Sequence, residues 1–143
     1  MRELGEEAER FGVIVGIEAG VNHPVYSPKT LERLLDEVAS NNLQIIFDPV
    51  NLLTIDNYGD QEAIFQHAFE LIGDRIAILH AKDFLVEEGE LKTVAVVQGL
   101  LNYEAVFRMI KPRKPYIQIL MESVKDPFIT SSVTYLQCIY NEV

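Results

Sequence analysis

The hydrophobic pattern divides the chain into short continuous apolar runs and longer segments with helical spacing. Unbroken runs of this length are typical of parallel strands that other elements cover, and they occupy residues 13–18, 43–48, 75–80 and 116–122. Apolar residues spaced three or four positions apart predict helices over 29–40, 61–72, 103–110 and 129–140, and residues 2–10 have helix-forming composition. Ser27 and Pro28 are a typical N-cap and first helical residue. Strands and helices are therefore expected to alternate.

The spacing of the runs predicts four successive βα units with parallel strands. The runs end at residues 18, 48, 80 and 122, and a strand–helix–strand unit takes about 30 residues or more. The last interval is longer, and its EEGE centre, residues 87–90, indicates a small hairpin or another excursion. An eight-unit barrel needs about 250 residues, so the chain is expected to be a partial (β/α)8 TIM barrel. The alternative, an open doubly wound sheet, predicts a G-x-G-x-x-G turn that GIEAG, residues 16–20, lacks.

Composition limits the classes of protein to consider. With 143 residues and 48% hydrophobic residues, the chain fits a single domain, residues 1–143. Its net charge of -10 argues against nucleic acid or an anionic membrane as a partner. A single cysteine, Cys138, excludes an internal disulfide and is expected to be a buried thiol in a helix. No run is long enough to cross a bilayer and the acidic start is unlike a signal peptide, so we expect a soluble cytoplasmic protein.

Each apolar run ends on a residue that can bind a metal or move a proton: Glu18, Asp48, His80 and Glu122. Ligands of parallel α/β folds bind outside the carboxyl ends of the strands, so these four side chains predict a single site. Mixed oxygen and nitrogen donors without a thiolate suit Mn²⁺, Mg²⁺, Co²⁺ or Zn²⁺. Side chains from four different strands converge only if the sheet curves, which favours the barrel.

Such a site predicts proton transfer next to a carbonyl. A divalent ion on two substrate oxygens stabilises an enediolate, and a neighbouring carboxylate removes the proton. If Glu18 and Glu122 flank the substrate from opposite sides, the proton returns on the far face and the reaction is epimerisation. Return of the proton to the adjacent carbon would instead be aldose–ketose isomerisation.

Five segments carry a resemblance to a known family: IEAG, FDPVNLL, LHAKDF, QGLLNY and ILMES. With them the chain resembles the C-terminal half of the xylose-isomerase-like TIM barrels, the sugar phosphate isomerase/epimerase group that includes ketose 3-epimerases, inosose dehydratases and endonuclease IV. The resemblance implies a divalent metal held by Glu18, Asp48, His80 and Glu122, with the two glutamates as the acid/base pair. It implies a sugar or sugar phosphate as substrate, and we expect Asn51, Lys82, Asp83 and His23 to contact it.

The chain departs from the family pattern in three places. Asn51 stands where the epimerases have the histidine of a D-x-x-H motif, and Val97-Gln98-Gly99 replaces a G-E-G turn. The strands that precede Glu18 in the family are missing from this sequence. A half barrel exposes two strand edges and an apolar face. We therefore expect association of two copies as a homodimer or homo-oligomer, or pairing with the missing N-terminal half, or a fragment of a longer protein.

Other functions stay open at this stage. A lyase of the inosose dehydratase type would use the same ion and the same proton abstraction. A non-catalytic module could keep the metal ligands without a complete pocket. The endonuclease IV type is disfavoured because the chain has three histidines, Asn51 in place of a fourth, and a charge of -10.

Overall fold

The computed structural model describes all 143 residues, and its centre is a parallel sheet of four strands. The strands are β1 (Val15–Glu18), β2 (Leu43–Phe47), β3 (Ile76–Ala81) and β6 (Gln118–Met121), and they lie side by side in chain order. Each strand runs parallel to its neighbour. The four apolar runs thus form the four predicted strands.

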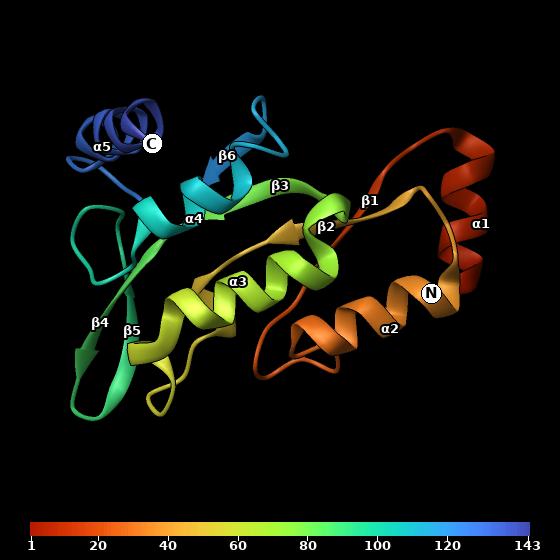
Figure 1. Cartoon of the computed structure of the whole chain (residues 1–143), viewed down its shortest axis with the longest axis horizontal. Coiled ribbons are helices and arrows are strands. Elements are labelled where there is room, and N and C mark those ends of the chain that lie inside the picture. The colour runs from red at the N-terminus through yellow and green to blue at the C-terminus, as the bar shows by residue number, and fades with distance from the viewer.

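The helices form one layer against this sheet. They are α1 (Arg2–Phe11), α2 (Pro28–Val38), α3 (Gln61–Ile72), α4 (Tyr103–Ile110) and α5 (Ile129–Glu142). From α2 to α5 each helix contacts the next, and Figure 1 shows them following one another across the sheet in chain order. A doubly wound sheet would have helices on both faces and would start in the middle of the strand order. The partial TIM barrel is therefore confirmed, and the doubly wound alternative is wrong.

Local sequence signals explain where α2 begins. The Ser27 side chain accepts a hydrogen bond from the Thr30 backbone N–H, and the Thr30 hydroxyl oxygen accepts one from the Ser27 N–H. Pro28 occupies the first turn, where its missing N–H costs no helical hydrogen bond. The predicted start of this helix is confirmed.

The hydrophobic core lies between the sheet and the helices. Alternate residues of the central strands point to the same face of the sheet, and Leu43, Ile45 and Phe47 of β2 are at most 2% exposed. The Phe47 ring packs edge-on against Phe65 and Phe69 of α3, with centroids 6.4 and 5.1 Å away. On the opposite face, which would be the inside of a barrel, Gln44 and Ile46 of β2 are only partly buried.

A hairpin follows β3. Strands β4 (Asp83–Glu87) and β5 (Glu90–Val94) pair antiparallel, and the two residues of their turn, Glu88 and Gly89, have positive φ angles of 52° and 79°. Two positive φ angles are typical of a type I′ turn. The EEGE segment is thus the small hairpin that the longer interval indicated.

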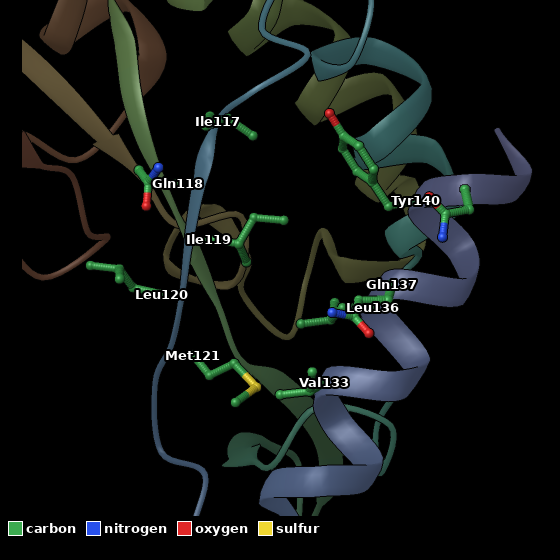
Figure 2. Close-up of a pocket in the computed structure, with 10 residues that line it drawn as sticks. Ile117, Gln118, Ile119, Leu120, Met121, Val133, Leu136, Gln137 and Tyr140 are labelled. Atoms are coloured by element: carbon green, nitrogen blue, oxygen red, sulfur yellow. The ribbon is translucent and has the colours of Figure 1, made fainter.

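Both outer strands of the sheet have a free edge. Strand β1 pairs only with β2, and β6 pairs only with β3. The chain termini lie at opposite ends of the molecule (Figure 1). An apolar groove of about 510 Å³ lies between β6 and α5. Figure 2 shows the side chains of Ile119 and Met121 pointing from β6 toward the helix. Leu120 points to the other side and is 49% exposed.

Two further sequence predictions concern single features. Cys138 is exposed on α5 and its thiol donates to Glu142, so the prediction of a buried thiol was wrong. The apolar stripe of α5 buries Leu136 instead, and Cys138 lies off that stripe. None of the helices combines the length and the apolar composition that crossing a bilayer requires.

Candidate metal centre

The ends of the four parallel strands bring four metal-binding side chains together. Glu18 is the last residue of β1 and His80 lies in β3, while Asp48 and Glu122 directly follow β2 and β6. One donor atom from each side chain lies within 4.8 Å of the other three. Because parallel strands end at the same edge of a sheet, a single cluster forms from residues that are far apart in sequence.

Asp48 is the most deeply buried member of the cluster. Its Oδ1 accepts backbone N–H groups of Val50 and Asn51 at 3.0 and 3.3 Å, which fixes the orientation of the carboxylate. Its Oδ2 is buried and has no aligned hydrogen-bond donor. Burial raises the pKa of Asp48 to about 6, although the nearby Lys82 ammonium offsets part of this effect.

Lys82 reaches into the cluster from the residue that follows β3. Its Nζ lies 2.8 Å from Asp48 Oδ2, and it donates a hydrogen bond to Glu122 Oε2 at 2.9 Å. Burial alone would lower the pKa of Lys82, but the two carboxylates outweigh burial and raise it. The same hydrogen bond lowers the pKa of Glu122. Lys82 lies two residues after His80, a spacing that places two side chains on the same face of an extended segment. This spacing was the sequence signal for its position.

Asn51 supports the cluster from the loop after β2. Its side-chain amide donates to Glu18 Oε1 at 2.7 Å and thereby orients one of the carboxylates. Glu18 Oε1 also lies 3.5 Å from His80 Nδ1. This contact between Asn51 and Glu18 was missed in the sequence, because it joins the end of β1 to a residue 33 positions away that only the fold brings near.

His23 lies outside the four-residue cluster. It is exposed, and together with Asn51 it lines a cavity of about 260 Å³ between the loop after β1 and the β4–β5 hairpin. The cavity also contacts Phe84 and Thr93 of that hairpin. A pocket lined partly by polar groups therefore adjoins the cluster through Asn51.

Asp83 has a different environment from its neighbour Lys82. It is 2% exposed, and its two carboxylate oxygens accept backbone N–H groups of Phe84, Gly99 and Leu101. A Cβ on Gly99 would lie 2.2 Å from Asp83 Oδ1, so only glycine fits there. The Tyr103 hydroxyl donates to the Lys82 carbonyl at 2.7 Å. These contacts, which sequence reasoning missed, fix the backbone beside Lys82.

The residues present fit a divalent metal ion. The donor set contains three carboxylates and one imidazole, which suits Mg²⁺, Mn²⁺, Co²⁺ or Zn²⁺. His80 Nδ1 is buried without a hydrogen-bond partner, and the buried Asp48 Oδ2 has only the Lys82 ammonium beside it, at 2.8 Å. Unsatisfied buried polar atoms are rare in folded proteins, and an ion is one reason for them. The roles of the four residues as ligands stay predictions.

Comparisons with known proteins agree with this architecture. Residues 1–132 match the family described as xylose isomerase-like TIM barrel. The chain matches no curated protein sequence. A xylose isomerase domain protein from Planctomyces limnophilus superposes with a TM-score of 0.77 at 20% identity, over 99% of this chain and 50% of that protein.

Two other solved structures also match nearly the whole chain over about half of their own length. A xylose isomerase-like TIM barrel protein from Mycobacterium smegmatis, in complex with magnesium, has a TM-score of 0.69 at 15% identity, over 98% of this chain and 48% of that one. The apo form of 3-keto-D-glucoside 4-epimerase, YcjR, from E. coli has a TM-score of 0.69 at 19% identity, over 96% of this chain and 50% of that protein. The chain thus spans about half the length of these proteins.

Proposed function

The chain belongs to the xylose isomerase-like TIM barrel family, and we propose that it carries the metal-binding half of a sugar or sugar-phosphate isomerase or epimerase. The observation that carries this proposal is the convergence of Glu18, Asp48, His80 and Glu122 from four separate strands. The magnesium in the Mycobacterium smegmatis relative and the epimerase activity named for YcjR support it.

The proposed chemistry begins with the substrate's carbonyl and a neighbouring hydroxyl. A divalent ion bound by the four residues would polarise the carbonyl and stabilise the enediolate that forms when the adjacent carbon loses its proton. Glu122, an ionised carboxylate at the end of β6 within the cluster, is suited by position to accept that proton. Glu18, oriented by the Asn51 amide, is the second proton carrier.

The positions of the two glutamates determine which reaction follows. They come from β1 and β6, the two outer strands of the sheet, with Asp48 and His80 between them. A substrate between the glutamates would lose a proton to one and regain it from the other, which is epimerisation. The same groups could return the proton to the neighbouring carbon and thereby isomerise the sugar, or support loss of hydroxide in a lyase of the inosose dehydratase type.

Substrate contacts are proposed for Asn51, His23 and Lys82. Asn51 and His23 line the polar cavity beside the cluster, where they could donate to sugar hydroxyls. Lys82 is the cation nearest the proposed ion and suits a sugar oxygen or a phosphate. Asp83 is left out of this group because both of its oxygens already accept backbone N–H groups.

We propose that the sheet is completed by four further βα units of the kind that form the other half of the relatives. Both outer strands have free edges, and the apolar groove beside β6 offers room for a neighbouring strand. A second copy of the chain would also supply strands, but it would bring another net charge of -10 and three more carboxylates into one barrel. The charge therefore favours a complementary half over a homodimer.

The mass of the chain in solution tests this choice of partner. Light scattering at increasing concentration should give the mass of a single chain, 16.2 kDa. A stable dimer that Leu120→Asp dissociates would show that a second copy occupies the open face, because Leu120 lies on that face of β6.

Proton exchange tests the proposed chemistry. The chain with Mn²⁺ is incubated in D₂O with fructose or fructose 6-phosphate, and deuterium on the carbons beside the carbonyl is followed by NMR. We expect exchange in the wild type and its loss in Glu122→Gln, with the fold retained. Glu104→Gln, on the exposed face of α4, is the control. Metal binding without exchange would instead favour the alternative, a non-catalytic binding module.

A further inference from the structure

Lys82 occupies the place where a metal ion would have to bind two of its ligands. Its Nζ lies 2.8 Å from Asp48 Oδ2 and 2.9 Å from Glu122 Oε2. Asp48 Oδ2 is the one oxygen of that carboxylate without a backbone donor, so it is the oxygen that an ion would use. The ammonium and the ion therefore compete for the same atom.

The lysine is held firmly in this position. Its side chain is 10% exposed, whereas the Glu122 side chain is 45% exposed and that of Asp48 is fully buried. The Tyr103 hydroxyl, on a ring that is 1% exposed, bonds the Lys82 carbonyl. A flexible surface lysine would lack both the burial and the backbone anchor.

Electrostatics gives Lys82 opposite effects in the two states of the site. A buried carboxylate without a partner is costly, so the ammonium stabilises Asp48 when no ion is bound. Once a divalent ion lies between the same carboxylates, the ammonium would be only a few ångströms from a second positive charge. Like charges at that distance repel strongly in a partly buried site.

We propose that Lys82 is an internal counter-cation, which holds Asp48 and Glu122 together in the metal-free protein and gives up these contacts when a divalent ion binds. The inference rests on the proposed metal site and adds that the site has its own resident cation. Lys82 thus lowers the affinity for metal while it raises the stability of the metal-free fold.

Substitution of Lys82 should therefore move two measurements in opposite directions. We expect Lys82→Met to lower the melting temperature of the metal-free protein and to tighten Mn²⁺ binding at least about tenfold, as measured by calorimetry at pH 8. Lys82→Arg keeps the charge and should not tighten binding. Lys92→Met removes an exposed ion pair with Glu87 on the hairpin and should change neither quantity.

The outcomes separate this inference from the proposed metal site. If the wild type binds Mn²⁺ and Lys82→Met binds it equally or more weakly, the inference is wrong while the metal site stands. If neither protein binds millimolar Mn²⁺, the metal site itself is wrong. Should Lys82→Met fail to fold, Lys82→Gln retains a hydrogen-bond donor without the charge, and the same tightening is expected.

Discussion

The central strands and the outer strands of the sheet differ in how completely the chain itself supports them. In β2 and β3, Leu43, Ile45, Ile76 and Leu79 are fully buried, whereas Leu120 of β6 is 49% exposed. The candidate ligands follow the same division. The side chains of Asp48 and His80 are 0% and 17% exposed, and those of Glu18 and Glu122 are 27% and 45% exposed.

This contrast indicates which part of the site is fixed in advance. Neighbours on both sides position the central pair, Asp48 and His80. The outer pair, Glu18 and Glu122, stands on strands with one free edge each. The central residues are therefore suited to hold an ion, and the outer residues to transfer protons.

The largest expected effect is on folding stability, at Phe47 in the centre of the sheet. Phe47→Ala removes a ring that packs against two phenylalanines of α3, and it should lower the free energy of unfolding by about 3–5 kcal/mol. Leu120→Ala, at the outer strand, should cost less than about 1 kcal/mol because its side chain is half exposed. Urea unfolding of both variants measures the difference, and equal losses would contradict the contrast.

Loss of a central ligand should reduce the affinity for metal more than loss of an outer ligand. We expect Asp48→Ala and His80→Ala to weaken Mn²⁺ binding by about a hundredfold or more. Their donor atoms are buried, so water does not take the place of the lost ligand. Glu18→Gln and Glu122→Gln should weaken it by only about tenfold. Calorimetric titration of the four variants measures these losses.

Two exposed residues provide matched controls for that titration. Asp56→Ala and His67→Ala remove the same kinds of side chain from the surface, and neither should change the affinity. If the glutamate variants of the outer strands lost more Mn²⁺ affinity than Asp48→Ala and His80→Ala, the proposed division of roles would be contradicted.

Metal binding should also weaken as the pH falls through about 6. The carboxyl pKa of Asp48 is raised to about 6 by burial, so below that value a proton competes with the ion for its oxygen. We expect the affinity to fall by about tenfold per pH unit below 6 and to be nearly constant between 7 and 8. Titrations at pH 5, 6 and 7.5 measure this dependence. An affinity that is unchanged at pH 5 would contradict the role of Asp48.

The same pKa affects the stability of the metal-free fold in the opposite direction. The folded-state pKa lies above the ordinary value of 3.8, so the folded state binds the proton more tightly than the unfolded state does. This contribution to stability is fully present below pH 3.8 and is lost as the pH rises to about 6. A bound ion would offset the loss above pH 6.

The smallest expected effect is a gain at Val97, beside the hairpin. Val97 has a φ of 81°, a conformation that β-branched residues rarely adopt. Val97→Gly should therefore stabilise the protein by up to about 1 kcal/mol. Ala39→Gly, at a helix end with a φ of 54°, should give a smaller gain because alanine is less strained there. Thermal unfolding measures both, and destabilisation by Val97→Gly would contradict the account.

The elements could be predicted from the sequence because their patterns are local. Helices α3 and α4 have the predicted bounds, since Ile72 is followed by glycine and Asn102 caps the start of α4. The positions of the four candidate ligands followed from where parallel strands end. These features depend on neighbours in sequence and on one rule of α/β architecture.

Contacts between residues that only the fold brings together could not be predicted in this way. The hydrogen bond from Asn51 to Glu18 joins residues 33 positions apart, and the close approach of Gly99 to Asp83 depends on how the hairpin folds back. Lys82 was expected near the site, but its pairing with Asp48 and Glu122 requires the distance between two strand ends. The prediction that the Cys138 thiol is buried was wrong because the apolar stripe of α5 centres on Leu136.

The most direct test is a crystal structure of the chain soaked with Mn²⁺, with diffraction measured at the manganese absorption edge. The account predicts one anomalous peak bounded by Glu18, Asp48, His80 and Glu122, with Lys82 Nζ displaced from Asp48 Oδ2. No peak between these side chains, or a peak only elsewhere on the surface, would contradict the claim that the four strand ends form one metal site.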